Sequence, residues 1–218
     1  MFVGHFGVGF AAKTAARSVS LGTLFLAAQF VDLLWPVLLL TGLETVEVEP
    51  GITAATPLDF ISYPWSHSLL MALIWGLLFM AIHFALKNGR KAALVAGLLV
   101  VSHWFLDLIV HRPDLPLTPW SEERFGLGLW HSTPLTLLVE LGIFGAGVFI
   151  YARATTARDR IGRWGLWSLV TFLLVIEVSN LLGPPPPSSE AIALVGHAQW
   201  LLILWGYWID RHRLPEPG

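Results

Sequence analysis

Three ionisable residues recur at every fourth position in one apolar stretch of the chain, within the sequence SHWFLDLIVHRPD. On a helix, this spacing places His103, Asp107 and His111 on one face, with neighbouring members on successive turns. An imidazole nitrogen and a carboxylate oxygen on adjacent turns can bind a single cation. His111 would lie about 12 Å from His103 along the helix, so a third ligand and a substrate contact at the external surface are both open roles. The alternative role for His103 and Asp107 is a hydrogen bond that links helices.

Further ionisable side chains lie within other apolar stretches or at their ends. They are Asp32, His67, His131, Glu140, Glu177 and His197. A charged group in the bilayer core is energetically costly, so such residues usually face the interior of a helical bundle and serve a function. When successive stretches cross a membrane in alternating directions, most of these residues fall in the external leaflet. Side chains that only stabilise helices would not gather in one leaflet, so the distribution favours a shared site.

The elements that carry these residues are long apolar runs. Six of them are long enough to cross a bilayer as helices, which takes about 20 residues. They lie at approximately 19–40, 66–86, 92–111, 130–152, 164–182 and 190–209. We therefore predict an all-α integral membrane protein with about six transmembrane helices, folded as a single bundle over residues 1–218. Residues 1–18 are expected to add a short N-terminal half-helix.

Composition excludes several classes of protein. Hydrophobic residues make up 55% of the 218 residues, charged residues only 13%, and the mean hydropathy is +0.67, values atypical of a water-soluble domain. The formal net charge of −2 and the lack of a long basic run argue against nucleic acid as a partner, because phosphate binding needs clustered cations. Without cysteine, thiolate catalysis and Cys-bound zinc are excluded, so any metal ion must bind His, Asp or Glu.

The charged residues of the connecting loops alternate in sign along the chain. Eleven of the thirteen Lys and Arg residues fall on one side of the predicted membrane, and the loop 41–65 on the other side is acidic. Positively charged loops remain in the cytoplasm during insertion. We therefore expect a multi-pass protein of the cytoplasmic (inner) membrane with a cytoplasmic C-terminus and with loops 41–65, 112–129 and 183–189 outside.

The N-terminal residues 2–12 are apolar and Gly-rich but only about half the length of a membrane span. A hairpin turn after this segment would bring His5 and Asp32 to similar depth, facing each other. Pro36 removes the hydrogen bond to the carbonyl of Asp32, so a kink is expected at this carboxylate. A cleaved signal peptide is the alternative for the N-terminus, but the apolar run continues to Leu40 and is too long for one.

Four short motifs in roughly the first 115 residues resemble those of the membrane-bound metal-dependent hydrolases, also described as LexA-binding, inner-membrane-associated hydrolases. The matching elements are an N-terminal His5, an acidic motif reduced to Asp32, Ser66-His67-Ser68, and Ser102-His103 followed by Asp107. The resemblance implies a metal site formed by His5, Asp32, His67, His103 and Asp107. The acidic motif lacks the Pro, the second Asp and the His of the family's PDxDH pattern. His111 and Asp114 are the residues that could compensate.

These features lead us to expect a membrane-embedded, metal-dependent hydrolase. One divalent ion, with zinc as the expected metal, would activate water for attack on an ester or phosphoester. A spare carboxylate, Asp107, Glu140 or Glu177, is expected to transfer protons, and His111 is a further candidate catalytic residue. The substrate entrance is assigned to His111, Asp114 and His131. A site in the external leaflet favours a lipid or lipid-linked substrate.

Two other classes of protein remain open. A transporter or proton relay would use the same intramembrane His, Asp and Glu residues as an ion pathway. It would need polar groups in both leaflets, whereas the cytoplasmic half offers little beyond His83. A structural scaffold would use the histidines for packing alone. Replacement of His103 distinguishes the three, because the enzyme would lose metal, the transporter flux, and the scaffold only stability.

Overall fold

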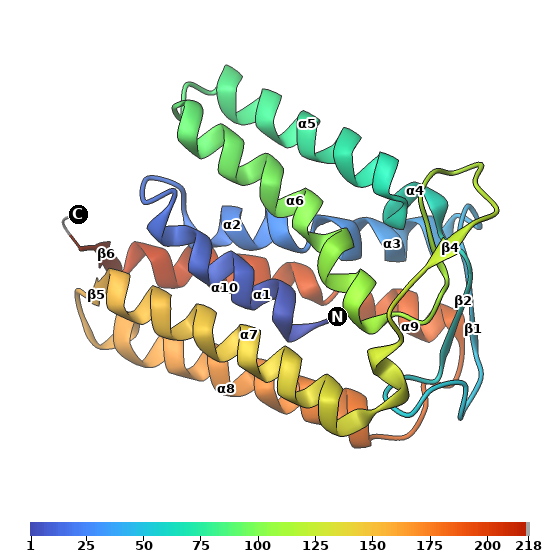
Figure 1. Cartoon of the computed structure of the whole chain (residues 1–218). Helices are drawn as coiled ribbons and strands as arrows, with labels where there is room; N and C mark the ends of the chain where they lie inside the picture. The colour runs from blue at the N-terminus through green and yellow to red at the C-terminus, as the bar shows by residue number, and fades with distance from the viewer. Residues whose placement is uncertain (217–218) are drawn as a thin grey trace.

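The structure, a computed structural model, describes residues 1–216, which form mostly helices with three two-stranded ribbons at the ends of the bundle (Figure 1). The helices are α1 (Val3–Ala11), η1 (Ala12–Thr14), α2 (Leu21–Ala28), α3 (Phe30–Leu40), α4 (Pro64–His67), α5 (Leu69–Ala85), α6 (Arg90–Val110), η2 (Leu129–His131), α7 (Thr133–Ala154), α8 (Arg160–Leu182), α9 (Ser189–Gly196) and α10 (Gln199–Arg211). The strands are β1 (Thr45–Val48), β2 (Leu58–Ser62), β3 (Leu115–Pro116), β4 (Arg124–Phe125), β5 (Thr155–Ala157) and β6 (Arg213–Pro215). The antiparallel pairs are β1 with β2, β3 with β4, and β5 with β6.

Within residues 1–216, four helical segments are long and apolar enough to cross a membrane, namely α6, α7, α8 and the segment Ser189–Arg211 that contains α9 and α10. The bent pair of α2 and α3 raises the number to five if it forms one crossing. The prediction of six spans is therefore not confirmed. In the predicted run 66–86, the long helix is α5, with only 17 residues. It is this short because α4 ends at His67 and Ser68 caps the start of α5.

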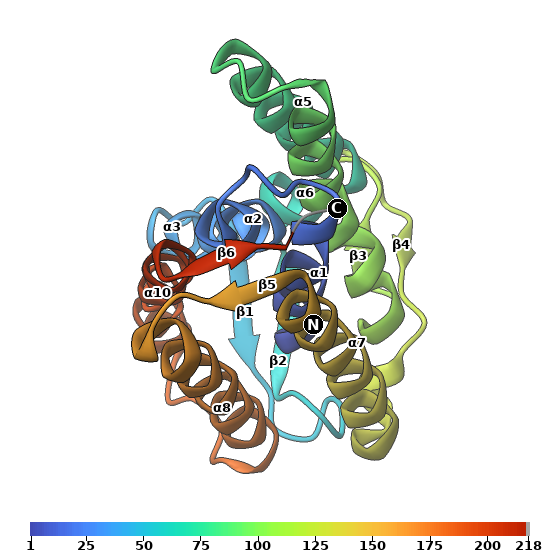
Figure 2. The same cartoon turned by 90° about the vertical axis from the view of Figure 1, so that its left-hand side faces the viewer.

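The short helix α1 lies inside the bundle, where it packs against α2, α6, α7 and α8 (Figure 2). It occupies the place of the predicted half-helix and continues into η1 before the chain turns back. Phe6 and Phe10 are fully buried, and both rings meet the ring of Phe25 edge-on, with centroids 5.0 and 4.8 Å apart. Such aromatic pairs stabilise packing beyond the area that they bury. The surrounding helices thus hold His5 of α1 in the interior.

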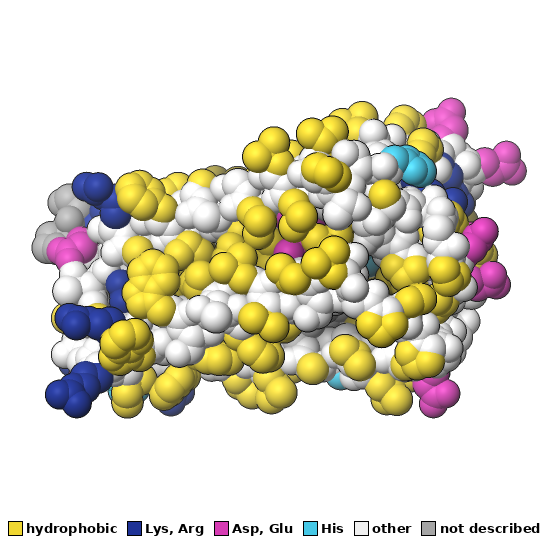
Figure 3. Space-filling model, turned by 90° about the horizontal axis from the view of Figure 1, so that it is seen from below, with side chains coloured by type: hydrophobic (Ala, Val, Ile, Leu, Met, Phe, Trp, Pro, Cys, Tyr) yellow, Lys and Arg dark blue, Asp and Glu magenta, His cyan; other side chains and the backbone are white. Residues whose placement is uncertain are grey.

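The two ends of the bundle differ in charge. The face in Figure 3 carries most of its Lys and Arg side chains at one end and most of its Asp and Glu side chains at the other, with hydrophobic side chains between them. The turns after α1, α5 and α7 lie together at the end that holds the ribbon β5–β6, and β1, β2 and β4 lie at the opposite end (Figure 1). The alternation of loop charge therefore corresponds to the two ends of the structure. The assignment of the basic end to the cytoplasm stays a prediction.

Two buried cations tie the chain together at the basic end. Lys13 donates to the carbonyl of Val19 and lies 2.8 Å from Asp210 at the end of α10. Arg213 donates to the carbonyls of Thr155 and Gly162. The polar groups in this half of the bundle therefore extend beyond His83. Removal of either cation would leave buried acceptors without a partner.

The packing of α1 on α7 depends on two glycines. A Cβ atom on Gly147 would lie 2.0 Å from the carbonyl oxygen of Gly7, and a Cβ atom on Gly7 would lie 2.7 Å from the carbonyl oxygen of Ile143. Small residues at such crossings let helix backbones approach closely. Gly145, two residues earlier on α7, faces open space.

We expect Gly147→Ala to lower the free energy of unfolding by about 1–3 kcal/mol, because the added methyl group meets backbone that cannot move aside locally. Gly145→Ala is the matched control and should be neutral or slightly stabilising, since alanine favours a helix. Thermal unfolding of the purified variants in detergent measures both effects. Equal stability of the two variants would contradict the close α1–α7 crossing.

Candidate metal centre

Five ionisable side chains from four helices meet inside the bundle. They are His5 on α1, Asp32 on α3, His67 on α4, and His103 and Asp107 on α6. The histidines and Asp107 are buried, and the side chain of Asp32 is 17% exposed. The structure thus brings together all the residues that the sequence assigned to a metal site.

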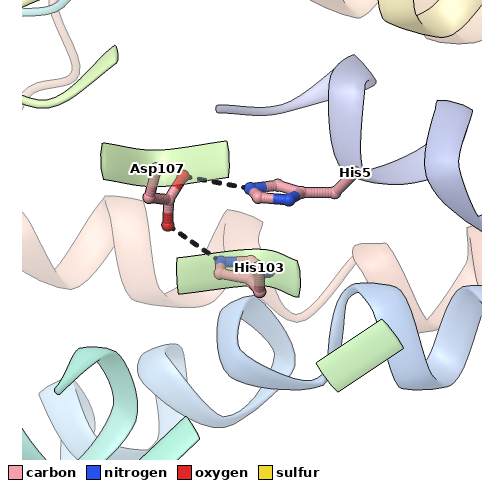
Figure 4. Close-up of side chains that lie close together, drawn as sticks. All are labelled: His5, His103 and Asp107. Carbon is pink, nitrogen blue, oxygen red and sulfur yellow. Dashed lines mark hydrogen bonds and ion pairs between the residues drawn. The ribbon is translucent and has the colours of Figure 1, made fainter. Parts of the chain in front are cut away.

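Asp107 contacts histidines with both of its carboxylate oxygens (Figure 4). Oδ1 accepts hydrogen bonds from His5 Nε2 at 3.1 Å and from the N-terminal ammonium of Met1, which forms an ion pair with it at 2.6 Å. Oδ2 lies 3.1 Å from His103 Nε2 and 3.8 Å from His67 Nε2. The rings of His5 and His103 stack with centroids 3.7 Å apart and 4° between their planes. Two imidazolium rings would repel each other at this distance, so at least one of the two rings is neutral.

Asp32 supplies the second carboxylate. Its Oδ1 lies 3.4 Å from His67 Nε2 and 3.5 Å from His103 Nε2. The chain bends by 55° at Gln29, between α2 and α3, and Asp32 stands in the first turn after the bend. The kink expected at Pro36 is thus a break further upstream, and Pro36 lies within α3. Among the described residues, the contacts of Asp32 are with His67 and His103, and the expected pairing with His5 is not one of them.

The break after α2 places the carbonyl that orients the ring of His103. Ala28 is the last residue of α2, and its carbonyl lies 2.9 Å from His103 Nδ1. A carbonyl oxygen only accepts hydrogen bonds, so Nδ1 is the donor. A neutral His103 therefore presents the lone pair of Nε2 towards the two carboxylates. This Nε2 atom is buried and forms no hydrogen bond with the residues that the structure describes.

A second set of hydrogen bonds orients the ring of His67, again through Nδ1. Glu44, in the loop before β1, accepts from the backbone amides of Trp65 and Ser66 at 2.8 Å each and from the Ser66 hydroxyl at 2.6 Å. The hydroxyl gives its only proton to Glu44, so Ser66 Oγ accepts from His67 Nδ1 at 2.7 Å. A neutral His67 therefore presents the lone pair of Nε2 towards Asp32. Sequence reasoning missed Glu44, because 22 residues separate it from Ser66 and it reads as one charge of an acidic loop.

When both rings are neutral, two imidazole lone pairs and two carboxylate oxygens face one another, an arrangement that a cation at its centre would stabilise. The distances from His67 Nε2 and His103 Nε2 to Asp32 Oδ1 and Asp107 Oδ2 are 3.1, 3.4, 3.5 and 3.8 Å. Ligand atoms bound tetrahedrally to zinc at about 2.0–2.1 Å lie about 3.4 Å from one another. The donor types and their spacing therefore fit a divalent cation. Among the described residues, the triplets His5–His103–Asp107 and Asp32–His67–His103 could each hold such an ion.

His111, Asp114 and Tyr63 form a second polar group close to this cluster. His111 follows the last residue of α6, and its Nδ1 donates to Asp114 Oδ1 at 2.8 Å, which also accepts from the Tyr63 hydroxyl at 2.7 Å. Burial lowers the pKa of His111, and burial together with Asp114 raises the pKa of Tyr63 well above its usual value. Neutral His111 then has Nε2 free to accept a proton. Its ring centroid lies 6.5 Å from that of His67.

The other residues singled out in the sequence have different surroundings. Glu140 accepts hydrogen bonds from the amides of Phe2 and Gly4 at 2.8 and 3.2 Å, so it anchors the start of α1 and, through it, His5. Glu177 is buried on α8. His131, at the end of η2, is exposed, and the structure does not bring it into the cluster.

The hydrogen bond from His67 to Ser66 leads to a test of the centre. We expect Ser66→Ala to weaken the affinity for zinc by about 10- to 100-fold, because residues that orient a ligating histidine contribute by this amount. Ser102→Ala is the matched control, since Ser102 precedes His103 but its hydroxyl donates to the carbonyl of Leu99. Competition with a chromophoric chelator measures both affinities. An unchanged affinity in Ser66→Ala would exclude this orienting role.

Comparison with known proteins adds no further assignment. No family model, no curated protein and no solved structure matches the chain. The resemblance to membrane-bound metal-dependent hydrolases therefore stays an interpretation of short motifs. The geometry of the cluster is therefore the basis for inferring a function.

Proposed function

We propose that this protein is a membrane-embedded hydrolase in which His67, His103, Asp32 and Asp107 hold one divalent metal ion. The observation that carries the proposal is that both histidines use Nδ1 as a hydrogen-bond donor and turn Nε2 towards two carboxylate oxygens. The mixture of nitrogen and oxygen donors favours zinc over magnesium or calcium, which prefer oxygen ligands. His5 binds the other oxygen of Asp107 and orients this carboxylate.

Hydrolysis is the reaction that this centre supports best. When bound, zinc would supply a Lewis acid, and a water bound to it in addition to these side chains would have its pKa lowered towards neutrality, which suits cleavage of an ester or phosphoester. We assign proton transfer to His111. Asp114 holds the proton on Nδ1 of His111, so Nε2 accepts a proton from the nucleophile and returns it to the leaving group. Tyr63 steadies the same carboxylate from the other side.

The position of the centre along the bundle indicates where the substrate arrives. α6 begins at Arg90 at the basic end, and His103 and Asp107 stand in its last two turns. If the basic end lies in the cytoplasm, as the positive-inside rule predicts, the centre lies in the external half of the membrane. A substrate that reaches it from the outer leaflet has an acyl chain. We therefore propose a lipid or lipid-linked ester or phosphoester.

Elemental analysis of the purified protein tests the metal centre. We expect about one zinc ion per chain in the wild type and almost none in the double variant His67→Ala/His103→Ala, which lacks both nitrogen ligands. His131→Ala is the matched control, because His131 is exposed and outside the cluster, and it should retain the wild-type content. Size-exclusion chromatography and circular dichroism establish that each variant is folded.

Two results would contradict the proposal. One is a zinc content near zero in the wild type even after reconstitution with excess ion. The other is equal zinc content in the wild type and the double variant. Either result would favour the transporter or proton relay, and ion flux into proteoliposomes would then be the next measurement.

The role of His111 makes a separate prediction for activity. We expect His111→Ala to lower kcat for an ester or phosphodiester substrate in mixed micelles by about 10²–10⁴-fold while the zinc content stays unchanged, because a proton acceptor is lost but no ligand is. His131→Ala again serves as the control. Loss of zinc together with activity would indicate that His111 is a ligand. An unchanged kcat would show that His111 does not take part in proton transfer.

A further inference from the structure

A cavity of about 560 Å³ opens at the basic end of the bundle, away from the His and Asp cluster. It lies between the turn that precedes α2, residues 14–18, and the turn that leads into α6, residues 88–92. Three of the lining residues are cations, Arg17, Arg90 and Lys91, and none is Asp or Glu. The volume is sufficient for a small polar group with several oxygen atoms.

The charge of this cavity is not compensated by the protein. Arg90 and Lys91 are exposed and form no ion pair with any residue that the structure describes. Arg17 donates from one nitrogen to the backbone carbonyl of Glu216, which leaves its positive charge unpaired. Three like charges around one cavity repel each other, and an anion that binds between them removes this repulsion.

The backbone adds donors to the same cavity. α6 begins at Arg90, directly after Gly89, whose φ of +89° favours glycine and leaves the helix without a capping side chain. Within residues 1–216, the amides of Arg90 and Lys91 form no hydrogen bond. Ser18 lies on the opposite wall together with Thr14, whose hydroxyl donates to the carbonyl of Ala11. Cations, amides and hydroxyls together are the groups that bind phosphate oxygens.

Exposed apolar side chains beside the cavity indicate the source of the phosphate. Phe84 on α5 is 62% exposed, Leu86 directly after α5 is 65% exposed, and Leu94 on α6 is 51% exposed. Basic residues at the ends of membrane helices lie at the level of the lipid headgroups, and apolar residues nearby contact the acyl chains. We propose that this cavity binds the phosphate of an anionic phospholipid. This site does not depend on the function proposed for the metal centre.

Native mass spectrometry of the full chain in detergent, titrated with phosphatidylglycerol, tests the site. The cavity variant is Arg17→Gln/Arg90→Gln/Lys91→Gln. The control variant is Arg158→Gln/Arg160→Gln/Arg163→Gln, which removes the same charge from the turn before α8 and from its start, at the same end of the bundle. We expect the affinity for phosphatidylglycerol to fall by at least about tenfold in the cavity variant, since each cation near a headgroup contributes about fivefold, and by less than about twofold in the control.

Three results would overturn the proposal. Equal losses in the two triple variants would indicate diffuse attraction to the basic end, and no loss in either would exclude the cavity. Competition by glycerol phosphate at the same concentration as the lipid would make the site one for soluble phosphates. The single variants Arg90→Gln and Lys91→Gln, on exposed side chains, give the same test if the triple variant does not fold. Zinc content unchanged in the cavity variant separates this site from the metal centre.

Discussion

The His and Asp cluster depends on two imidazole rings that are each held by a hydrogen bond from Nδ1. His103 donates to the carbonyl of Ala28, and His67 donates to the hydroxyl of Ser66. Neither ring can rotate without leaving a buried acceptor unpaired, which costs about 1–3 kcal/mol. Nε2 of both rings must therefore face the carboxylates of Asp32 and Asp107. When both rings are neutral, a cation at the centre of this group would offset the charge of the two carboxylates.

The irregular elements of the bundle serve this arrangement. The break at Gln29 ends α2 at Ala28, so that the carbonyl of this residue can accept from His103, and it also starts the turn that carries Asp32. The separate helix α4 places His67 at its last residue, next to the Ser66 hydroxyl bound to Glu44. Uninterrupted spanning helices would supply none of these contacts. α1, which is too short to cross a membrane, delivers its histidine from the centre of the bundle (Figure 2).

The cluster was more predictable than the path of the chain. His103 and Asp107 stand out because ionisable residues in apolar helices have few other roles, and their spacing of four is visible in the sequence. Hydropathy measures the length of an apolar run but does not reveal where a helix is interrupted. It therefore predicted continuous spans, whereas the helices are interrupted at Gln29 and Ser68. The role of Glu44 could not be predicted from the sequence. Its loop folds back onto Trp65, and no periodic pattern in the sequence indicates this contact.

A crystal structure of the zinc-loaded protein, with diffraction data collected on both sides of the zinc absorption edge, tests the central claim most directly. We predict one anomalous difference peak within about 2.0–2.2 Å of Nε2 of both His67 and His103 and of an oxygen of both Asp32 and Asp107. His5 should remain bonded to the other oxygen of Asp107. A peak elsewhere, or a cluster without a peak in crystals of the zinc-loaded protein, would contradict the account.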